Sequence, residues 1–367
     1  MLRVLHVIGK MDRAGAETVI MNIYRNIDRE RIQFDFMVFS SEEGDYDSEI
    51  KQMGGRIYRM PQFKGTNYVD SCKRFKKFFK EHPYKVVHGH IGSCAPAYLY
   101  YAKKNGGFTI AHSHNTDSSI MWKRMAYKCL TRPVIHVADY FMACSEEAGR
   151  DRFGEKIAAQ ENFRIMNNAI NAKEFTYTEK RHDMLKDRYG LSDKLVVGHV
   201  GRFAEQKNHG FLIDVFENIK KKNDNAILLL VGTGEDLDKM KEKVKNRHLE
   251  EAVRFLGIRE DIPELMNLFD VFVFPSVFEG LGIVGIEAQA AGLPCFLSDA
   301  VPNEAVLTPG TWKLPLEWGA ERWAVEITEK LKSFKRMDNY KRIVEGGYDI
   351  KRLAKSMEIF YLSKGNK

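Results

Sequence analysis

Short apolar runs alternate along the whole chain with longer stretches in which apolar residues recur at helical spacing. The runs are nearly continuous, which is typical of strands in a parallel sheet that is covered on both faces. The strands predicted in the first half are Arg3–Ile8, Phe34–Phe39, Arg56–Arg59, Val86–His88, Thr109–His112 and Tyr140–Ala143. The helices predicted between them are Ala16–Asn26, Asp70–Lys80, Pro96–Lys104, Ile120–Thr131 and Glu146–Arg152.

The same alternation starts again in the second half. Its predicted strands are Leu195–Val200, Ala226–Val231, Val253–Leu256, Val271–Phe274 and Pro294–Leu297. Its predicted helices are Phe211–Lys221, Asp236–Arg247, Gly285–Ala291 and Glu321–Ser333, and an amphipathic helix follows at Ile350–Tyr361. The chain has 367 residues, too many for one ordinary core, and two such series predict an α/β fold with two Rossmann-like, doubly wound parallel-sheet domains.

We place the first domain at residues 1–170 and the second at residues 171–349. The boundary is expected at Asn167–Asn171 and in the polar stretch that follows, to about Tyr189. A ligand is expected in the crevice between the strand carboxyl ends of the two domains.

Composition excludes several classes of protein. Apolar residues make up 44% of the chain and charged residues 29%, which is ordinary for a globular protein, and no apolar run is long enough to span a membrane. The five cysteines are scattered without a Cys-x-x-Cys pair, which favours free thiols in a reducing cytosol. The net charge of +7 lies entirely in residues 1–170, with 26 Lys+Arg against 19 Asp+Glu, and favours an anionic ligand or surface. No nucleic-acid motif accompanies it.

The most informative segment is Pro275–Gly292, in which an apolar strand ends and a glycine-rich turn leads into a helix. The first N–H groups of such a helix form an anion site. Glu279 lies in the turn and Glu287 on the helix, and carboxylates cannot bind an anion. They are better suited to accept hydrogen bonds from hydroxyls, so the segment indicates a ligand with both phosphate and hydroxyl groups, such as a sugar nucleotide.

A second strand, Leu195–Val200, opens into a loop that contains two cations, Arg202 and Lys207. An Arg fork and a Lys ammonium suit phosphate oxygens, although a solvated loop of ordinary charges remains the alternative. Asp12–Glu17, with Gly15, forms the first turn between strand and helix, where a backbone can approach a ligand or simply cap a helix.

Two pairs of histidines, His88 with His90 and His112 with His114, each end a predicted strand. Residues at this spacing share a face of the strand, so each pair could bind a metal. No third ligand is apparent in the sequence, and we predict no metal site. Asp45-Tyr-Asp47 has the form of a diphosphate-metal motif, but its acidic surroundings indicate a solvated loop.

The segment Cys72–Lys80 places three phenylalanines at helical spacing among five basic residues. This pattern is typical of a helix that packs its phenylalanines on a sheet and leaves its lysines in water. The alternative is a helix that lies on an anionic membrane surface.

The combination of Gly201-Arg-x4-Lys207-Asn208 with Glu279-x7-Glu287 resembles the retaining glycosyltransferases of family 4, which have the GT-B fold and act in bacterial capsule and exopolysaccharide synthesis. The resemblance covers essentially the whole chain. Met166–Asn171 is similar to the family's interdomain segment and Gly257–Pro263 to its base-binding loop. It implies two domains that face each other across a deep cleft, with the helix at 350–367 packed back on the first.

The resemblance also implies roles for the matching residues. Arg202 and Lys207 would hold the donor diphosphate, and Glu287 would accept from the nucleotide ribose. Glu279 and the backbone of Gly280, Leu281, Gly282 and Ile283 would hold the donor sugar. His114 would lie near the outer hydroxyls of that sugar, Gly15 near the phosphate, and Arg259 in the base-binding loop. This chain has Gly15-Ala16 where the family often has Gly-Gly.

These observations predict transfer of a hexose or N-acetylhexosamine, with retention, from a nucleoside diphosphate sugar such as a UDP-sugar, without a metal or other cofactor. The first domain would bind a lipid-linked saccharide acceptor at the inner face of the plasma membrane, and the protein would be cytoplasmic. The alternatives are a glycosidase, a sugar-nucleotide epimerase of GT-B fold, and a non-catalytic sugar-binding protein. A glycosidase also uses two carboxylates but has no diphosphate for Arg202 and Lys207 to hold.

Overall fold

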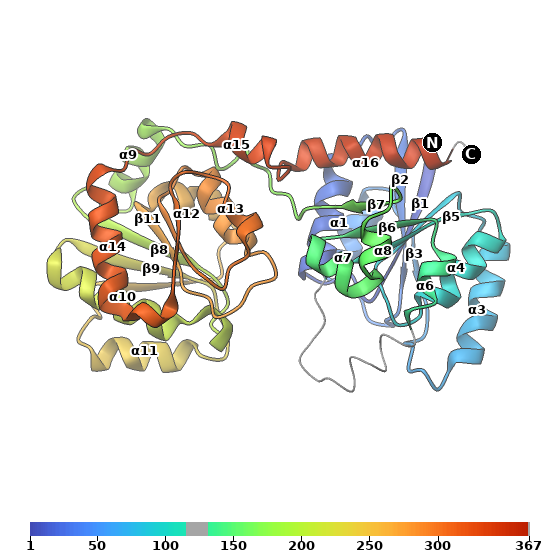
Figure 1. Cartoon of the computed structure of the whole chain (residues 1–367), viewed down its shortest axis with the longest axis horizontal. Coiled ribbons are helices and arrows are strands. Elements are labelled where there is room, and N and C mark those ends of the chain that lie inside the picture. The colour runs from blue at the N-terminus through green and yellow to red at the C-terminus, as the bar shows by residue number, and fades with distance from the viewer. Residues whose placement is uncertain (115–130, 366–367) are drawn as a thin grey trace. The chain divides into compact units, whose positions relative to one another are not determined.

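The computed structural model describes residues 1–114 and 131–365 of the chain. It divides into two compact units, Met1–Ala169 with Ile350–Lys367, and Ile170–Asp349. Each unit is a sheet with helices on both faces (Figure 1). Every strand pair is parallel, which confirms the predicted fold class. The helix predicted at Ile120–Thr131 lies outside the described residues, apart from Thr131.

The first unit contains a seven-stranded sheet with the order β3-β2-β1-β4-β5-β6-β7. Its strands are β1 (Leu2–Ile8), β2 (Ile32–Val38), β3 (Ile57–Arg59), β4 (Val86–Gly89), β5 (Phe108–Ser113), β6 (Tyr140–Ala143) and β7 (Phe163–Ile165). Its described helices are α1 (Gly15–Asn26), α2 (Asp47–Gln52), α3 (Tyr68–Glu81), α4 (Ala95–Lys104), α6 (Val134–Val137), α7 (Glu146–Phe153), α8 (Glu155–Ala158) and α16 (Ile350–Gly365).

The two faces of this sheet are covered by different helices. Val4 and Ile8 of β1 pack with α1 and α16, whereas Leu5 and Val7 pack with α3, α4 and α6. The helix α16 therefore completes the core of the unit in which the chain begins, although it comes from the other end of the chain. An ion pair between Arg31 and the buried Glu358 fixes it there.

The second unit contains a six-stranded sheet with the order β10-β9-β8-β11-β12-β13. Its strands are β8 (Leu195–Val200), β9 (Ala226–Val231), β10 (Val253–Gly257), β11 (Val271–Phe274), β12 (Cys295–Ser298) and β13 (Thr311–Leu314). Its α-helices are α9 (Glu179–Arg188), α10 (His209–Lys222), α11 (Leu237–Asn246), α12 (Ile262–Leu268), α13 (Ile283–Ala290), α14 (Gly319–Ser333) and α15 (Tyr340–Glu345). Its 3-10 helices are η1 (Glu205–Lys207), η2 (Asn303–Ala305) and η3 (Leu316–Trp318).

Two strands that the apolar pattern did not predict, β7 and β13, lie at sheet edges. Each is short and partly exposed, with Arg164 or Lys313 among its residues. An edge strand needs fewer apolar residues than a central one, because one of its sides faces no other strand. The pattern therefore identified the centre of each sheet but not its outer strands.

The polar stretch assigned to the domain boundary was wrong in its extent. Residues 179–188 form the helix α9. Thr178 caps its start, because the Thr178 hydroxyl accepts a hydrogen bond from the N–H of Arg181. Leu185 is buried in the core of the second unit, and Lys186 forms a 2.7 Å ion pair with Asp270. The stretch is therefore part of the second unit, and its buried face is too narrow to stand out in the sequence.

The acidic loop around Asp45-Tyr-Asp47 also differs from its prediction. Asp47 begins α2 and is 2% exposed, and its carboxylate forms an ion pair with Arg59. Asp45 accepts from the N–H of Arg13 over 2.9 Å. Asp45 is exposed, as the solvated-loop prediction expects, whereas Asp47 is buried and held by Arg59.

Candidate functional site

The carboxyl ends of β8 and β11 mark the place where the strand order of the second sheet reverses. β8 pairs with β9 on one side and with β11 on the other. The helices that follow these two strands, α10 and α13, cover opposite faces of the sheet. In doubly wound sheets a crevice opens at such a point and binds the ligand. The two segments with the strongest sequence signals, Gly201–Asn208 and Pro275–Gly292, both start here.

Direct hydrogen bonds join these two segments. The N–H of Val277 donates to the carbonyl of Gln206 over 2.9 Å, and the side-chain amide of Gln206 donates to the carbonyl of Phe278 over 3.0 Å. Lys207 ends the short helix η1, and Asn208, with a left-handed φ of 55°, turns the chain into α10. The Lys207 side chain therefore starts beside the turn that carries Glu279.

Lys207 and Glu279 form an ion pair across the switch point. Lys207 Nζ lies 2.5 Å from Glu279 Oε1, and the side chains are 16% and 7% exposed. The same ammonium lies 4.8 Å from the ring centroid of Phe274, the last residue of β11. At this low exposure, a charge left without its partner would be costly. Each residue therefore holds the other in place.

The amino end of α13 lies in the same turn. Its first residue follows Gly282, which has a φ of +76° that a residue with a side chain rarely adopts. No side chain caps this end of the helix. A Cβ at Gly280 would meet no atom within 4 Å, so the fold itself does not require glycine there. The N–H groups of the turn and the first helical turn are arranged to bind an anion.

Glu287 lies on α13, one turn beyond its start. Its side chain is partly exposed, but the surrounding protein removes most water from the carboxylate and raises its pKa to about 7. Glu279 and Glu287 therefore have different environments, since one carboxylate is paired with Lys207 and the other is destabilised by desolvation. A carboxylate like that of Glu287 gains from a ligand hydroxyl that donates to it.

The two predicted arginines lie at the same edge of the sheet, on the loops that follow β8 and β10, which are separated by β9. Arg202 is exposed and pairs with Glu235 over 2.9 Å. Arg259, in the loop after β10, donates to Asp261 over 2.6 Å and to the hydroxyl of Tyr189 over 3.3 Å. An exposed ion pair such as Arg202–Glu235 contributes about 0–1 kcal/mol to the stability of the fold. Arg202 can therefore leave Glu235 and bind a ligand at little cost.

Gly15 and His114 belong to the first unit, at the carboxyl edge of its own sheet. Gly15 begins α1 after β1, and a Cβ there would meet no atom within 4 Å. His114 follows β5, and burial lowers its pKa to about 4. Both residues lie where a doubly wound sheet binds its ligand.

The sequence did not reveal that five histidines converge at this edge: His6, His88, His90, His112 and His114. His6 Nδ1 lies 2.9 Å from His90 Nε2, and His90 Nδ1 lies 2.7 Å from His114 Nε2. They come from β1, β4 and β5, which are neighbours in the sheet. The available signal was that the His-x-His pairs end consecutive strands, but it is useful only once the strand order is known.

Two family models match the chain, one on each unit. Residues 13–174 match the model described as Glycosyltransferase Family 4, and residues 183–346 match Glycosyl transferases group 1. EpsF of Bacillus subtilis (strain 168), described as a glycosyltransferase, is 36% identical over 309 residues, which cover 82% of this chain and 80% of EpsF. The chain belongs to glycosyltransferase family 4. Its strongest sequence motifs are therefore those of an enzyme family.

Two further relatives of this family 4 glycosyltransferase have more specific names. The capsular polysaccharide biosynthesis glycosyltransferase CapH of Staphylococcus aureus is 26% identical, with 99% of both chains covered. The UDP-Gal:alpha-D-GlcNAc-diphosphoundecaprenol alpha-1,3-galactosyltransferase of Escherichia coli is 24% identical, over 83% of this chain and 81% of that protein.

The solved structure of Anabaena Alr3699/HepE in complex with UDP has the same fold, with a TM-score of 0.80 at 17% identity. The match covers 99% of this family 4 chain and 100% of HepE. The two sheet units are therefore the two lobes of the GT-B fold, as the resemblance implied. Among the helices that the structure describes, none has the length and apolar character that a membrane span requires.

The raised pKa of Glu287 predicts a pH-dependent effect of Glu287→Gln on stability. The folded protein binds this proton more tightly than the unfolded chain, whose carboxyl has a pKa near 4.5, so the carboxylate destabilises the fold increasingly from pH 4.5 to about 7. Glu287→Gln removes this cost. We expect no gain at pH 4.5 and a rise of about 2–4 °C in Tm at pH 8, as about 1 kcal/mol would give.

Thermal denaturation at pH 4.5, 6, 7 and 8 measures this difference. Glu321→Gln, which changes an exposed carboxylate on α14, is the control and should give a difference that does not grow with pH. A Glu287→Gln effect that is the same at every pH would contradict the prediction.

Proposed function

We propose that this glycosyltransferase moves a hexose or N-acetylhexosamine from a UDP-sugar to a lipid-linked saccharide, with retention, in surface polysaccharide synthesis. The observation that carries the proposal is the Lys207–Glu279 ion pair beside the uncapped start of α13. Lys207 supplies a cation, Glu279 a carboxylate and the start of α13 a set of N–H groups, and all three lie around one turn. A sugar nucleotide needs these three together, since it presents phosphate and hydroxyl groups side by side.

The cations and the helix start would act on the leaving diphosphate. Cleavage of the bond between the sugar carbon and the phosphate oxygen leaves negative charge on that oxygen. Lys207, Arg202 and the N–H groups at the start of α13 would stabilise this charge as it develops. When phosphate oxygens approach, Lys207 can bind them while it keeps its contact with Glu279, because an ammonium has three donors.

The carboxylates and the first-lobe residues would hold the rest of the donor. Glu279 and the backbone of Gly280–Ile283 would bind the sugar, and Glu287 the ribose. Arg259 lies in the loop assigned to the base. In our proposal His114 contacts the outer hydroxyls of the sugar and Gly15 the phosphate.

The transfer itself would be a substitution on one face of the sugar. The acceptor hydroxyl oxygen forms the new bond to the anomeric carbon as the bond to the phosphate oxygen breaks, and the acceptor proton passes to that phosphate oxygen. The carboxylate of Glu279 is already engaged with Lys207, which donates to Oε1 over 2.5 Å. This supports a route in which the leaving group, rather than a carboxylate, accepts the proton.

The names of the relatives support the choice of donor and acceptor. HepE was solved with UDP, and the galactosyltransferase of Escherichia coli is named for a UDP-sugar donor and a diphosphoundecaprenol-linked acceptor. The name of CapH refers to capsular polysaccharide. A thermal-shift screen of sugar nucleotides against the full chain would identify the donor. Free epimer formed without an acceptor would indicate the epimerase instead.

The decisive substitution is Glu279→Gln, which removes the carboxylate charge and keeps the size of the side chain. We expect transfer to fall about 10²–10³-fold, the range for loss of one preorganised group that acts in the transition state. UDP affinity should stay within about threefold, because Lys207 is released to bind phosphate. Initial rates and calorimetric titration with UDP measure the two effects.

Glu235→Gln is the matched control, because Glu235 is the exposed partner of Arg202 and lies outside the turn. It should leave both rate and UDP affinity nearly unchanged. Equal losses of transfer and UDP binding in Glu279→Gln would overturn the sugar role assigned to Glu279.

Removal of divalent metal is expected to leave transfer intact. The proposed charge stabilisation uses Lys207, Arg202 and a helix start, and none of these needs a cation. Initial rates before and after treatment with EDTA, followed by gel filtration, measure this. Complete loss of activity that manganese restores would refute the metal-free site.

The basic helix α3 supports contact with a membrane surface. Its phenylalanines Phe75, Phe78 and Phe79 are buried in the first unit, as the packing interpretation predicted. The basic residues Lys73, Arg74, Lys76, Lys77 and Lys80 are exposed. Tyr68 and Val69 on the same helix, and Tyr100 on the adjacent α4, are 52%, 68% and 49% exposed. Exposed aromatic and basic side chains together suit an anionic lipid surface.

Vesicle sedimentation tests this surface. The protein should sediment with vesicles that contain anionic lipid and remain in solution with neutral ones. The triple substitution Lys73→Glu, Lys76→Glu and Lys80→Glu should abolish the difference, since each basic residue near the surface contributes about 1 kcal/mol. Charge reversal in the second unit, Lys239→Glu, Lys241→Glu and Lys245→Glu on α11, is the control. Equal sedimentation with both kinds of vesicle would remove the proposal.

A further inference from the structure

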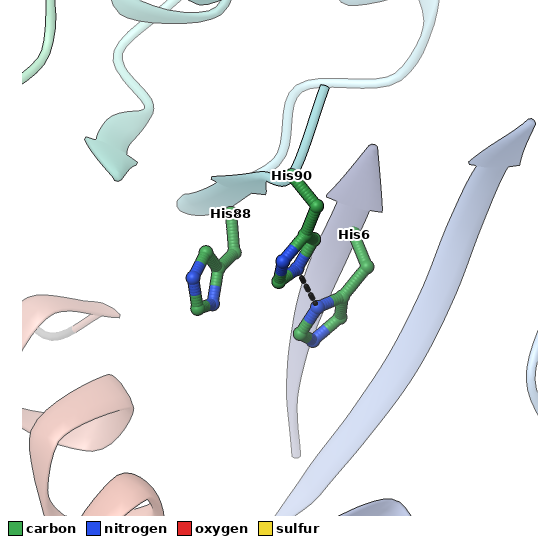
Figure 2. Close-up of side chains that lie close together, drawn as sticks. All are labelled: His6, His88 and His90. Carbon is green, nitrogen blue, oxygen red and sulfur yellow. Dashed lines mark hydrogen bonds between the residues drawn. The ribbon is translucent and has the colours of Figure 1, made fainter. Parts of the chain in front are cut away.

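The five histidines at the edge of the first sheet form two hydrogen-bonded series. One runs from His6 through His90 to His114. The other runs from Tyr361 of α16 through His88 to His112, with 2.7 Å between Tyr361 Oη and His88 Nδ1 and 3.2 Å between His88 Nε2 and His112 Nδ1. Figure 2 shows His6 joined to His90 while His88 makes no bond to either.

These bonds determine which ring nitrogens are free to bind something else. His88 uses both of its nitrogens, one with Tyr361 and one with His112. His112 uses only Nδ1, and its Nε2 is buried with no partner among the described residues. If the Nδ1 proton of His112 is donated to His88, then Nε2 carries a lone pair, as a metal ligand requires. The residue itself is 6% exposed.

His90, His112 and His114 also line one cavity. Its volume is about 180 Å³, and Asp151 and Arg152 of α7 contribute to its wall. Each of the three histidines offers a ring nitrogen, and these atoms all lie within 4.8 Å of one another. His6, His88 and His90 form a second group at this spacing, but His6 and His88 are not part of the cavity wall. Only the first group therefore combines a lone pair with space for an ion.

We propose that His90, His112 and His114 form a binding site for a divalent transition-metal ion of the Zn²⁺ type. Zinc accepts three imidazole nitrogens at 2.0–2.1 Å and keeps a fourth position open, so a tetrahedral site places the nitrogens roughly 3.3 Å apart. His90 Nδ1 and His114 Nε2 lie 2.7 Å apart and share a proton. For the cation to bind, the proton between these two nitrogens moves to Nδ1 of His114, so that both nitrogens present lone pairs, and the rings move apart by about half an ångström.

The surroundings of the three rings suit this ion. Imidazole binds a metal ion in its neutral form. Neutral imidazoles favour zinc, copper and nickel over magnesium and calcium. In the tautomers that metal binding requires, His90 and His112 donate from their outer nitrogens to His6 and His88, which thereby orient them.

Bound metal would join the ends of β4 and β5, because His90 follows the one strand and His112 and His114 come from the other. The metal would also occupy Nε2 of His114. The proposed transfer needs no metal, so this site does not depend on that reaction, and binding of the ion is measured without it.

Equilibrium dialysis of the full chain against Zn²⁺ alone, read by elemental analysis, tests the site. The wild type should retain one equivalent. His112→Asn and His114→Asn should each weaken binding at least about tenfold, as loss of a ligand does. His136→Asn is the control, since His136 is an exposed histidine of the same unit, and it should bind as the wild type does. Circular dichroism confirms that each variant is folded.

Co²⁺ in place of Zn²⁺ adds a spectroscopic reading, because tetrahedral nitrogen ligation gives visible absorption bands that His112→Asn should abolish. Three results would each overturn the proposal: no retained zinc in the wild type, retention that His112→Asn and His114→Asn leave unchanged, or loss of zinc in His136→Asn as well. Loss in His6→Asn with retention in His112→Asn would assign the ion to the other group and would also overturn it.

Discussion

The carboxyl ends of parallel strands all lie at one edge of a sheet, and in each unit of this protein the strand order reverses once along that edge. In the second unit the reversal lies between β8 and β11, and in the first it lies between β1 and β4. Helices that follow the two strands cover opposite faces, so the loops part and leave a crevice. Lys207 and Glu279 lie at the reversal of the second sheet, and the histidines extend from the reversal of the first sheet to the end of β5.

In the second lobe, the reversal is what allows Lys207 and Glu279 to meet. They are 72 residues apart, and each follows a different one of the two neighbouring strands. Two largely buried charges of opposite sign hold each other in position, and this fixes the turn before α13. A preorganised site of this kind loses little entropy when a ligand binds, which is a main way that enzymes reduce the cost of stabilising charge.

The sequence predicted the central strands of each sheet better than the edge strands. It also predicted which loops carry the site residues better than which of those residues are in contact. β8, β9 and β11 have the predicted bounds because they are apolar on both faces, whereas β7 and β13 expose polar residues and were missed. The motifs placed Lys207 and Glu279 on loops that end strands, but their ion pair depends on which strands are neighbours. The histidine cluster depends on the same information. Strand order is set by packing of the whole sheet, and no local pattern encodes it.

The two lobes differ in the charge of the side chains at the points where their strand order reverses. The second lobe presents paired charges, which suit a diphosphate whose charge increases during cleavage. The first presents imidazoles that burial keeps neutral, with the pKa of His6 lowered to about 3 and that of His114 to about 4. A neutral imidazole can bind a sugar hydroxyl without opposing the charge on the diphosphate. The proposed metal would take Nε2 of His114, so a hydroxyl and a metal would be alternative ligands of the same imidazole.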